Sequence, residues 1–330
     1  MKVKLSASRI KTAQSCSWRY YCSYILKLPD KSNDGASRGS VCHNVFEYLS
    51  KLKTKNYYNK IVKNQDPFCV PAVKKMITSM AKELKVDDEE NMALIKEMIL
   101  NGLSCDFHGE ELGVPDEAHA ELNFDIEANG YHIRGFIDQL FLYKDKKIAL
   151  IRDYKTSKSV FQGKEISDNL QDYIYCLAIK HLFPEYENRQ SEFLFLKFDL
   201  KNKGRLKMES IEEDDMDGFE IQLSSIQNWL ENFDENDAKS NFAAKKRYPT
   251  DKSFSGPLMC GFAKTKGQLK IDGSPMWACP MRHPFSYVKI LDSKGNFLKS
   301  VFEEDFSEED VPENGSFEKQ EYLGCPHFYN

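Results

Sequence analysis

GFIDQLFLYKDKKIALIRDYKTSKS, which spans residues 135–159, is the stretch of sequence that decides the fold. It contains most of one apolar run, Tyr131 to Tyr143, and all of a second, Ile148 to Lys155, with a polar turn between them. Just upstream, Ala118 to Glu127 alternates apolar and polar residues, and Asn129-Gly130 is a typical two-residue hairpin turn. The three runs therefore predict an antiparallel three-stranded meander.

Apolar residues recur at helical spacing on both sides of this meander. We expect a first helix from Ser6 or Ser8 and a second after Arg38, followed by helices at Pro71 to Leu84, Glu89 to Leu103, Asp168 to Phe183 and Ile221 to Phe233. A further strand is expected at Ser191 to Leu200. This order of elements indicates an α/β fold with a central mixed sheet flanked by helices.

Composition limits the classes of protein that the chain can belong to. The 330 residues carry 46 basic and 51 acidic side chains, a net charge of −5, which is ordinary for a globular protein and unlike a disordered or fibrous chain. No apolar run approaches the roughly 20 residues that a membrane helix needs, and the start shows no secretory signal. Nine cysteines, an odd number, favour a reducing cytoplasm over a disulfide framework.

The chain changes character near Lys245. Residues 1–245 carry the predicted helices and strands, whereas residues 246–330 are rich in Cys, Gly and Pro. We therefore expect a boundary near Lys245, with an N-terminal domain at residues 1–245 and a C-terminal region at residues 246–330.

Two carboxylates and a lysine border the core of the predicted sheet. Asp153 and Lys155 share one face of their strand because side chains alternate, and the antiparallel neighbour can place Asp138 on the same face. Such an oxygen-rich site suits Mg²⁺ or Mn²⁺, and a lysine beside the ion can help to deprotonate an attacking water. Solvated charge on an exposed strand is the alternative, but unpaired charge at the edge of an apolar run is costly.

Several motifs around this segment resemble those of the PD-(D/E)XK nuclease superfamily, in particular its RecB-like branch with the AddB and CRISPR-associated exonucleases. From Leu5 to about Leu200 they are LSASRI, RGSVCHNVFEYL, AELNF, GFID, DYKT and NLQDYIYCLAI. The resemblance implies a restriction-endonuclease-like core and metal-dependent hydrolysis of DNA. It also implies a role in recombination, repair or replication, in a bacterial or phage-infected cell.

The resemblance assigns roles to single residues. His43, Asp138 and Asp153 match the metal ligands, and Lys155 matches the catalytic lysine. A lone helix histidine is also a common packing residue, and only the G-x-x-x-H pattern favours His43 as a ligand.

Three further residues match positions beside the active site. Gln171 and Tyr175 match a Q-x-x-x-Y helix motif that helps to hold DNA, and Glu121 matches an upstream glutamate of variable role. Because Glu121 points away from the face of its apolar neighbours, simple exposure is the alternative. Ile137 stands where the superfamily name has a proline, as is common in this branch.

The late cysteines suggest a second metal site. AddB-type and CRISPR-associated relatives often carry a 4Fe–4S cluster with one cysteine before the nuclease core and three after it. Here Cys16 or Cys22 would be the early ligand, and Cys260, Cys279 and Cys325 the late ones, tying the C-terminal region to the N-terminal helix. Their wide spacing departs from the tight grouping usual in those relatives.

Zinc is the competing interpretation of the same residues. Cys279 with His283, and Cys325 with His327, give two short Cys/His pairs, although not at standard finger spacings. In the third interpretation they are buried hydrophobes without metal, the role expected of Cys42, Cys69, Cys105 and Cys176.

DNA is the expected partner. Lys2, Lys4, Arg9, Lys11 and Arg19 alternate with Trp18, Tyr20 and Tyr21, and residues 245–248 form a second basic run, a mixture that suits a single strand. No reading helix or finger array is apparent, so we expect an exonuclease or a single-strand nuclease. The alternatives are a DNA-binding or assembly subunit that cuts little, and a metal-stapled interaction protein. Either would partner a helicase or recombinase.

Overall fold

The computed structural model describes residues 2–30, 33–243, 260–261, 268–269, 271, 273, 276 and 278–329. It divides into two compact units. Unit 1 comprises Met1–Ala7 and Ser32–Asn228, and unit 2 comprises Ser8–Lys31 and Trp229–Asn330. In the C-terminal half the two units divide between Asn228 and Trp229. The sequence predicts a boundary near Lys245, a residue outside the described ones.

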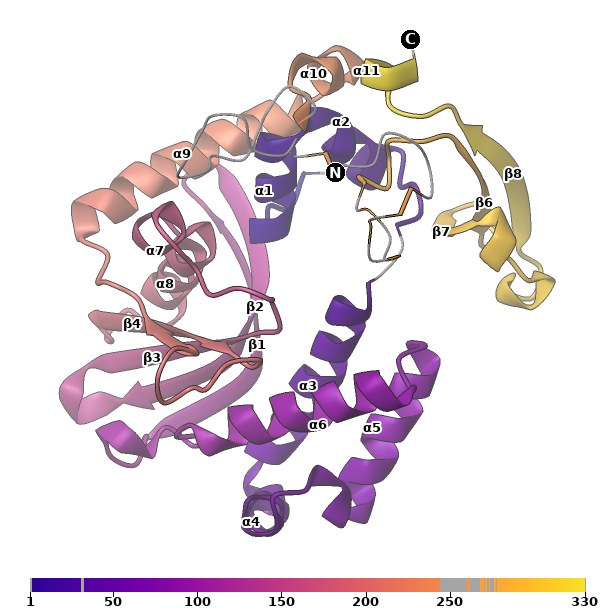
Figure 1. Ribbon diagram of the computed structural model, residues 1–330. Coiled ribbons are helices and arrows are strands. Elements are labelled where there is room, and N and C mark those ends of the chain that lie inside the picture. The colour runs from indigo at the N-terminus through magenta and orange to yellow at the C-terminus, as the bar shows by residue number, and fades with distance from the viewer. Residues whose placement is uncertain are drawn as a thin grey trace. The chain divides into compact units, whose positions relative to one another are not determined.

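Unit 1 is built on a mixed five-stranded sheet in the order β1-β2-β3-β4-β5 (Figure 1). Its strands are β1 (Glu117–Ala128), β2 (Tyr131–Tyr143), β3 (Ile148–Lys155), β4 (Asn188–Phe195) and β5 (Arg205–Lys207). Only β3 and β4 pair in parallel, through the crossover helix α8 (Leu170–Leu182). The predicted meander and the α/β class with a mixed sheet are confirmed.

Helices cover both faces of this sheet (Figure 1). On one side lie α3 (Asp34–Ser50), α4 (Lys55–Asn64), α5 (Pro71–Glu83) and α6 (Glu89–Ser104). Phe46 of α3 packs on the buried ring of Tyr154, with 4.3 Å between ring centroids. The opposite face receives α8, whose Tyr175 donates a hydrogen bond to Asp153. Strand alternation therefore gives Tyr154 to the helical core and Asp153 to the α8 side.

Some boundaries differ from the sequence prediction. The helix expected at Ile221, α9 (Glu213–Glu231), begins eight residues earlier, with three acidic residues in its first turn, where they suit the helix dipole. Strand β4 ends at Phe195 rather than Leu200, because Asp199 accepts the backbone N–H of Lys201 in a turn. The short helix α7 (Lys164–Ser167) precedes α8.

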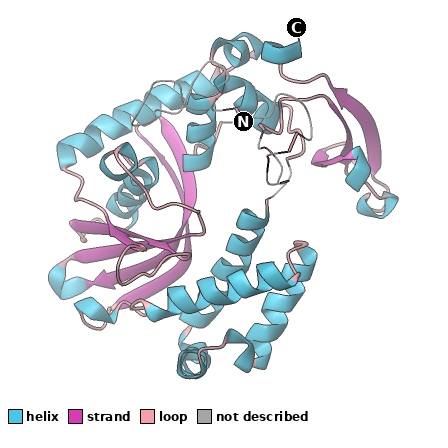
Figure 2. Ribbon diagram, in the orientation of Figure 1, coloured by secondary structure: helices cyan, strands magenta, loops and turns pink. Residues whose placement is uncertain are grey.

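Unit 2 combines the segment after Ala7 with the C-terminal region. Its helices are α1 (Ala7–Ser15), α2 (Ser17–Tyr20), a π-helix (Tyr21–Ile25), α10 (Glu235–Ser240) and α11 (Pro326–Tyr329). Its antiparallel sheet has three strands in the order β7-β6-β8: β6 (Phe285–Leu291), β7 (Phe297–Phe302) and β8 (Ser316–Tyr322). Strands are drawn in magenta in Figure 2. The acidic stretch from Glu303 to Glu321 contains two single 3₁₀ turns and most of β8.

The first predicted helix is broken at Cys16. This residue has an extended backbone (φ −157°, ψ 107°) between α1 and α2. The aromatic core of unit 2 then forms around Trp18, Tyr287 and Tyr322, with the Trp18 indole N–H donating to the Tyr322 hydroxyl at 2.7 Å. Cys16 thus lies at the break between the two helices, and its partly buried side chain packs against this core.

Candidate functional site

Three carboxylates occupy one row across β1, β2 and β3. The pairs on either side in the β1–β2 ladder place Glu121 opposite Asp138. The β2–β3 ladder ends at Gln139 and Arg152, and the next row places Asp138 opposite Asp153. Adjacent strands therefore carry acidic side chains at the same height, where like charges repel one another unless a cation lies between them.

The sheet opens at this row. The Asp138 Oδ2 atom accepts the backbone N–H of Tyr154 at 2.7 Å, so a side chain replaces the next rung of the β2–β3 ladder. In β1, Glu121 has a φ of +49°, a left-handed conformation in an otherwise extended strand. Such backbone strain is costly for a residue with a Cβ and is typical of functional sites.

His43 of α3 joins two of these carboxylates. Its Nδ1 atom lies 3.3 Å from Asp138 Oδ1 and 3.7 Å from Glu121 Oε1. One ligand atom from each of the three residues lies within 4.8 Å of the others, a donor set that fits a divalent cation. The Nε2 atom of His43 lies 3.2 Å from the Tyr154 carbonyl oxygen, which orients the ring as a second partner of a metal-binding histidine does.

The charges gathered at this site shift the pKa of both Asp138 and His43. Burial raises the pKa of Asp138 to about 6, and the charge of Asp153 adds to the shift, while His43 opposes it. Burial alone would lower the pKa of His43, but hydrogen bonds to Asp138 and Glu121 raise it to about 10. In the absence of a cation, a proton on His43 therefore neutralises part of the carboxylate charge.

Asp153 and Lys155 form the second half of the site. The Lys155 Nζ atom lies 2.7 Å from Asp153 Oδ2 and donates to Gln171 Oε1 at 2.6 Å. Gln171 Nε2 and the Tyr175 hydroxyl both donate to Asp153 Oδ1, each at 2.8 Å. Burial and the charge of Asp153 raise the pKa of Tyr175, which keeps its hydroxyl a donor. The ammonium group of Lys155 is thus fixed beside the carboxylate row.

All seven residues singled out from the sequence meet in this one place in unit 1. The predicted shared face of Asp153 and Lys155 is confirmed by their ion pair. The grouping differs in one respect, because the third donor beside His43 and Asp138 is Glu121, while Asp153 is held by Gln171 and Tyr175. Counting residue pairs outward from the Asn129-Gly130 turn would have predicted that Glu121 is near Asp138, because it places residue 121 opposite residue 138.

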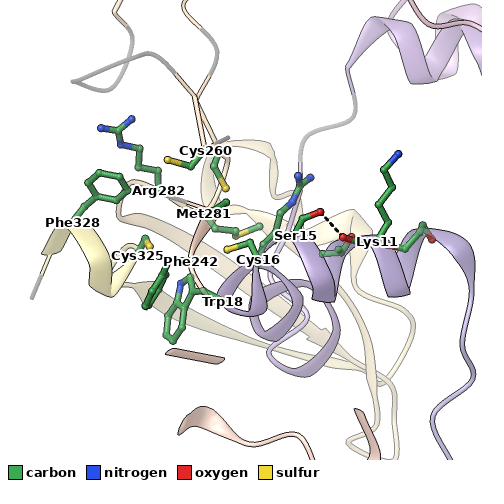
Figure 3. Close-up of a pocket in the computed structure, with 15 residues that line it drawn as sticks. Lys11, Ser15, Cys16, Trp18, Phe242, Cys260, Met281, Arg282, Cys325 and Phe328 are labelled. Carbon is green, nitrogen blue, oxygen red and sulfur yellow. Dashed lines mark hydrogen bonds between the residues drawn. The ribbon is translucent and has the colours of Figure 1, made fainter. Parts of the chain in front are cut away.

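A second candidate site is a cavity of about 510 Å³ in unit 2. Its lining includes Cys16, Cys260, Cys279 and Cys325, so the break between α1 and α2 and three late segments supply one cysteine each (Figure 3). Three cations, Lys11, Arg19 and Arg282, line the same cavity. Positive side chains beside cysteines stabilise thiolates, the form that binds metal.

The structure separates these cysteines from the other candidates. Cys22 is fully buried, its Sγ atom lies 3.7 Å from the Tyr322 hydroxyl, and it does not line the cavity. His283 and His327 are also absent from that lining; His283 Nδ1 lies 2.6 Å from the Tyr329 hydroxyl. The set that faces the cavity is therefore Cys16 with the three late cysteines, and not the two Cys/His pairs.

The thiols of the cavity are not gathered as tightly as zinc requires. Four thiolates on one tetrahedral Zn²⁺ lie about 3.8 Å apart, given a Zn–S bond of about 2.3 Å. Among the described residues, no three cysteine sulfurs lie within 4.8 Å of one another. Burial raises the pKa of Cys279 and of Cys325 to about 11, so a metal group would have to displace their protons.

Of the predicted packing cysteines, Cys42, Cys105 and Cys176 are buried, and Cys69 is partly buried against the core of unit 1.

The predicted base-stacking surface is partly wrong. Trp18 and Tyr20 are buried, at 8% and 1% exposure, so neither ring can stack on a base. Lys2 and Lys4 form ion pairs with Glu127 and Asp125 of β1, respectively. The second basic run, residues 245–248, lies outside the described residues.

Membrane insertion finds no support in the helices. In the part of the chain that the structure describes, none is both long and apolar enough to cross a bilayer.

Comparison with known proteins gives remote similarities. No curated protein matches. The solved structure titled "Crystal structure of SSO0001" is 18% identical with a TM-score of 0.27, and the match covers 56% of this chain and 90% of that one. Protein VC1899 from Vibrio cholerae is 11% identical with a TM-score of 0.22, over 72% of this chain and 59% of that one. At these TM-scores neither similarity carries an argument.

The family, by contrast, is shown by sequence. The profile of the PD-(D/E)XK nuclease superfamily matches residues 4–252, which include the whole carboxylate row, His43 and Lys155. The mixed sheet flanked by helices is the restriction-endonuclease-like core that the earlier resemblance implied. The chain belongs to the PD-(D/E)XK nuclease superfamily.

Proposed function

We propose that this chain is a metal-dependent deoxyribonuclease of the RecB-like branch, which hydrolyses phosphodiester bonds in DNA. One observation carries the proposal: the row of Glu121, Asp138 and Asp153, with His43 at one end and an immobilised Lys155 at the other. A decayed site would have lost at least one member of this set. Superfamily membership supports nuclease chemistry in general.

Mg²⁺ or Mn²⁺ would be held by His43 and Asp138, together with Glu121 or Asp153. The imidazole nitrogen among the carboxylates suits Mn²⁺ better than Mg²⁺, which prefers oxygen ligands only. When bound, the ion supplies Lewis acidity, activating water and offsetting charge on the phosphate.

The chain's own residues do the remaining work. Lys155 reaches the site with its ammonium held by Asp153 and Gln171, at 2.7 and 2.6 Å, so it can orient water and transfer a proton at Nζ without first losing side-chain freedom. Tyr175 and Gln171 occupy Asp153 Oδ1, which leaves Oδ2 toward Lys155. The His43 ring, held at the Tyr154 carbonyl, keeps Nδ1 directed at Asp138.

We also propose that the cavity in unit 2 holds a 4Fe–4S cluster on Cys16, Cys260, Cys279 and Cys325. Two observations support this proposal: the four cysteines line one cavity, and its volume of about 510 Å³ leaves room for a group wider than a single zinc ion. Lys11, Arg19 and Arg282 would offset the negative charge of its four thiolates.

DNA ends or single strands are the substrates we expect, with a helicase or recombinase as partner.

Cleavage of end-labelled single-stranded and duplex DNA tests the enzyme proposal. Wild-type protein is assayed in Mg²⁺ and in Mn²⁺ beside Lys155→Ala and a matched control, Lys144→Ala, which removes an exposed lysine at the end of β2. Wild type and the control should cut, and Lys155→Ala should not. A wild type that binds DNA without cutting in either metal would instead identify a DNA-binding subunit.

A further inference from the structure

Three cations gather beyond the carboxyl ends of β3 and β4. The two parallel strands end side by side, where Lys155 pairs with Phe195, and the chain continues from them to Lys158 and Lys197. The start of α3 lies against the same ends, because the Thr156 hydroxyl donates to the Gly35 carbonyl at 3.3 Å. A Cβ on Gly39 would lie 3.1 Å from that hydroxyl, so only glycine allows this approach without displacing Thr156.

The guanidinium of Arg38, a residue of α3, lies near these carboxyl ends of β3 and β4. The side chain is only 8% exposed, and among the described residues its one hydrogen bond runs from Nη1 to the amide oxygen of Asn91, a neutral group. Its Nε atom is buried and has no partner among the same residues. The nearby carboxylates of Asp34 and Asp88 bond the amide nitrogen of Asn91 instead.

Lys197 and Lys158 are likewise unneutralised. Neither forms an ion pair or a side-chain hydrogen bond within the described residues, whereas other lysines of unit 1, such as Lys51 and Lys147, bind carboxylates at 2.9 Å. Burial lowers the pKa of Lys197, and the charges of Arg38 and Lys158 lower it further. The three cations are therefore close enough to repel one another.

Such a cluster costs free energy unless an anion neutralises it. A buried guanidinium nitrogen without an acceptor carries a desolvation penalty, and like charges add to it. The cluster, defined as Arg38, Lys158 and Lys197, follows directly on the strand that carries Lys155. An anion bound there would lie next to the carboxylate row, as the next phosphate of a strand bound at that row would.

We propose that the Arg38 cluster binds a backbone phosphate of the DNA strand, next to the phosphodiester bond that is cut. This inference rests on the proposed function, since it takes DNA to be the substrate. A phosphate offers several acceptor oxygens, enough for the guanidinium of Arg38 and for two ammonium groups at once. The cluster would fix the register of the strand over the carboxylate row.

Binding without catalysis tests the cluster separately from cleavage. Fluorescence anisotropy in EDTA measures the affinity for a labelled single-stranded oligonucleotide at several salt concentrations, for wild type, Lys197→Ala, Lys158→Ala and a control, Lys203→Ala. Lys203 is an exposed lysine without an ion pair in the structure, six residues beyond Lys197. Each cluster variant should bind several-fold more weakly. The slope of log K against log salt should fall by about 0.7 per lost phosphate contact on a single strand.

Two further comparisons sharpen the result. Oligonucleotides with a 5′-phosphate and a 5′-hydroxyl distinguish the sources of the phosphate: equal losses indicate an internal phosphodiester, and a loss confined to the first indicates a terminal phosphate. Arg38→Lys keeps the charge but removes Nε, and its thermal unfolding shows whether it folds. Unchanged affinity and slope in Lys197→Ala and Lys158→Ala would overturn the proposal, even if the protein cuts DNA. Weakened binding in a protein that never cuts would overturn the nuclease instead.

Discussion

The carboxylate row in unit 1 and the cysteine cavity in unit 2 are both candidate metal sites, but they are organised in opposite ways. In the row, the protein itself fixes nearly every donor: Tyr154, Gln171 and Tyr175 all hydrogen-bond to the acidic side chains. In the cavity, the four thiols come from separate segments: a backbone hydrogen bond joins Cys279 to Cys260, but no three cysteine sulfurs of the described residues lie within 4.8 Å of one another. A preorganised site needs the metal only for chemistry, whereas a loose one needs it for structure.

The largest expected effect lies in the cavity. Cys279→Ser should abolish bound iron and the absorbance at roughly 400 nm that is expected of an iron–sulfur cluster. It should also lower the unfolding temperature, because the cluster ties distant segments together. Iron and sulfide analysis of anaerobically purified protein, followed by thermal unfolding, provides the measurement.

Cys22→Ser is the matched control, since Cys22 is buried near the cavity but does not line it. Retention of iron by Cys279→Ser, or equal loss in both variants, would contradict the assignment. An unchanged unfolding temperature in iron-free Cys279→Ser would show that the cavity is as preorganised as the carboxylate row.

The next largest effect concerns catalysis. Asp138→Asn keeps the shape of the side chain but removes the charge that His43 faces, and we expect cleavage to fall by about 10³-fold, equivalent to several kcal/mol of transition-state stabilisation. Iron content and unfolding temperature should stay near those of wild type, because burial and Asp153 already disfavour the charged form of Asp138. Single-turnover cleavage and thermal unfolding together check this. A variant that cuts normally would remove Asp138 from the site.

A smaller effect should appear in the pH dependence of metal binding. In the metal-free protein the pKa of His43 is raised to about 10, so near neutral pH the ring is protonated and must lose its proton to bind a cation. Mn²⁺ affinity should therefore rise as pH rises, by about tenfold per pH unit below that pKa. Calorimetric titrations at about pH 7 and 8 would measure it. His43→Gln should remove most of this slope; an equally steep slope in that variant would place the proton elsewhere.

The smallest effect tests how far the row depends on its hydrogen bonds. Gln171→Ala removes one acceptor from Lys155 and one donor to Asp153 but leaves their ion pair intact. We expect kcat to fall by about tenfold, the loss associated with about 1.4 kcal/mol, with a shift in the pH profile of kcat. A loss as great as that of Lys155→Ala would mean that Gln171 has a more direct role than positioning.

Much of unit 1 could be predicted from sequence because its signals are local. The Asn129-Gly130 turn and the alternating runs predict the hairpin. The bounds of β3 are those expected, Ile148 to Lys155. The shared face of Asp153 and Lys155 follows from strand geometry alone. The resemblance to the family's motifs then predicted that His43 and Gln171 lie beside these two residues.

What escaped prediction depends on tertiary structure. No local pattern announces the left-handed backbone of Glu121, which arises where the sheet opens at the carboxylate row. The choice between Cys16 and Cys22 likewise depends on the extended residue that interrupts the first helix, within a stretch whose apolar spacing is helical throughout. Burial of Trp18 and Tyr20 follows from packing within unit 2 that aromatic composition alone does not indicate.

The break at Cys16 also has a consequence for biosynthesis. Its sulfur leaves the ribosome long before the other three cysteines of the cavity, because nearly all of unit 1 is translated between residues 16 and 260. Unit 1 can therefore fold while the thiol of Cys16 waits without partners, and the cavity is complete only when Cys325 has been made. Until then that thiol has no cysteine partner in the cavity, so the proposed cluster could be completed only if Cys16 is still reduced when Cys325 is made.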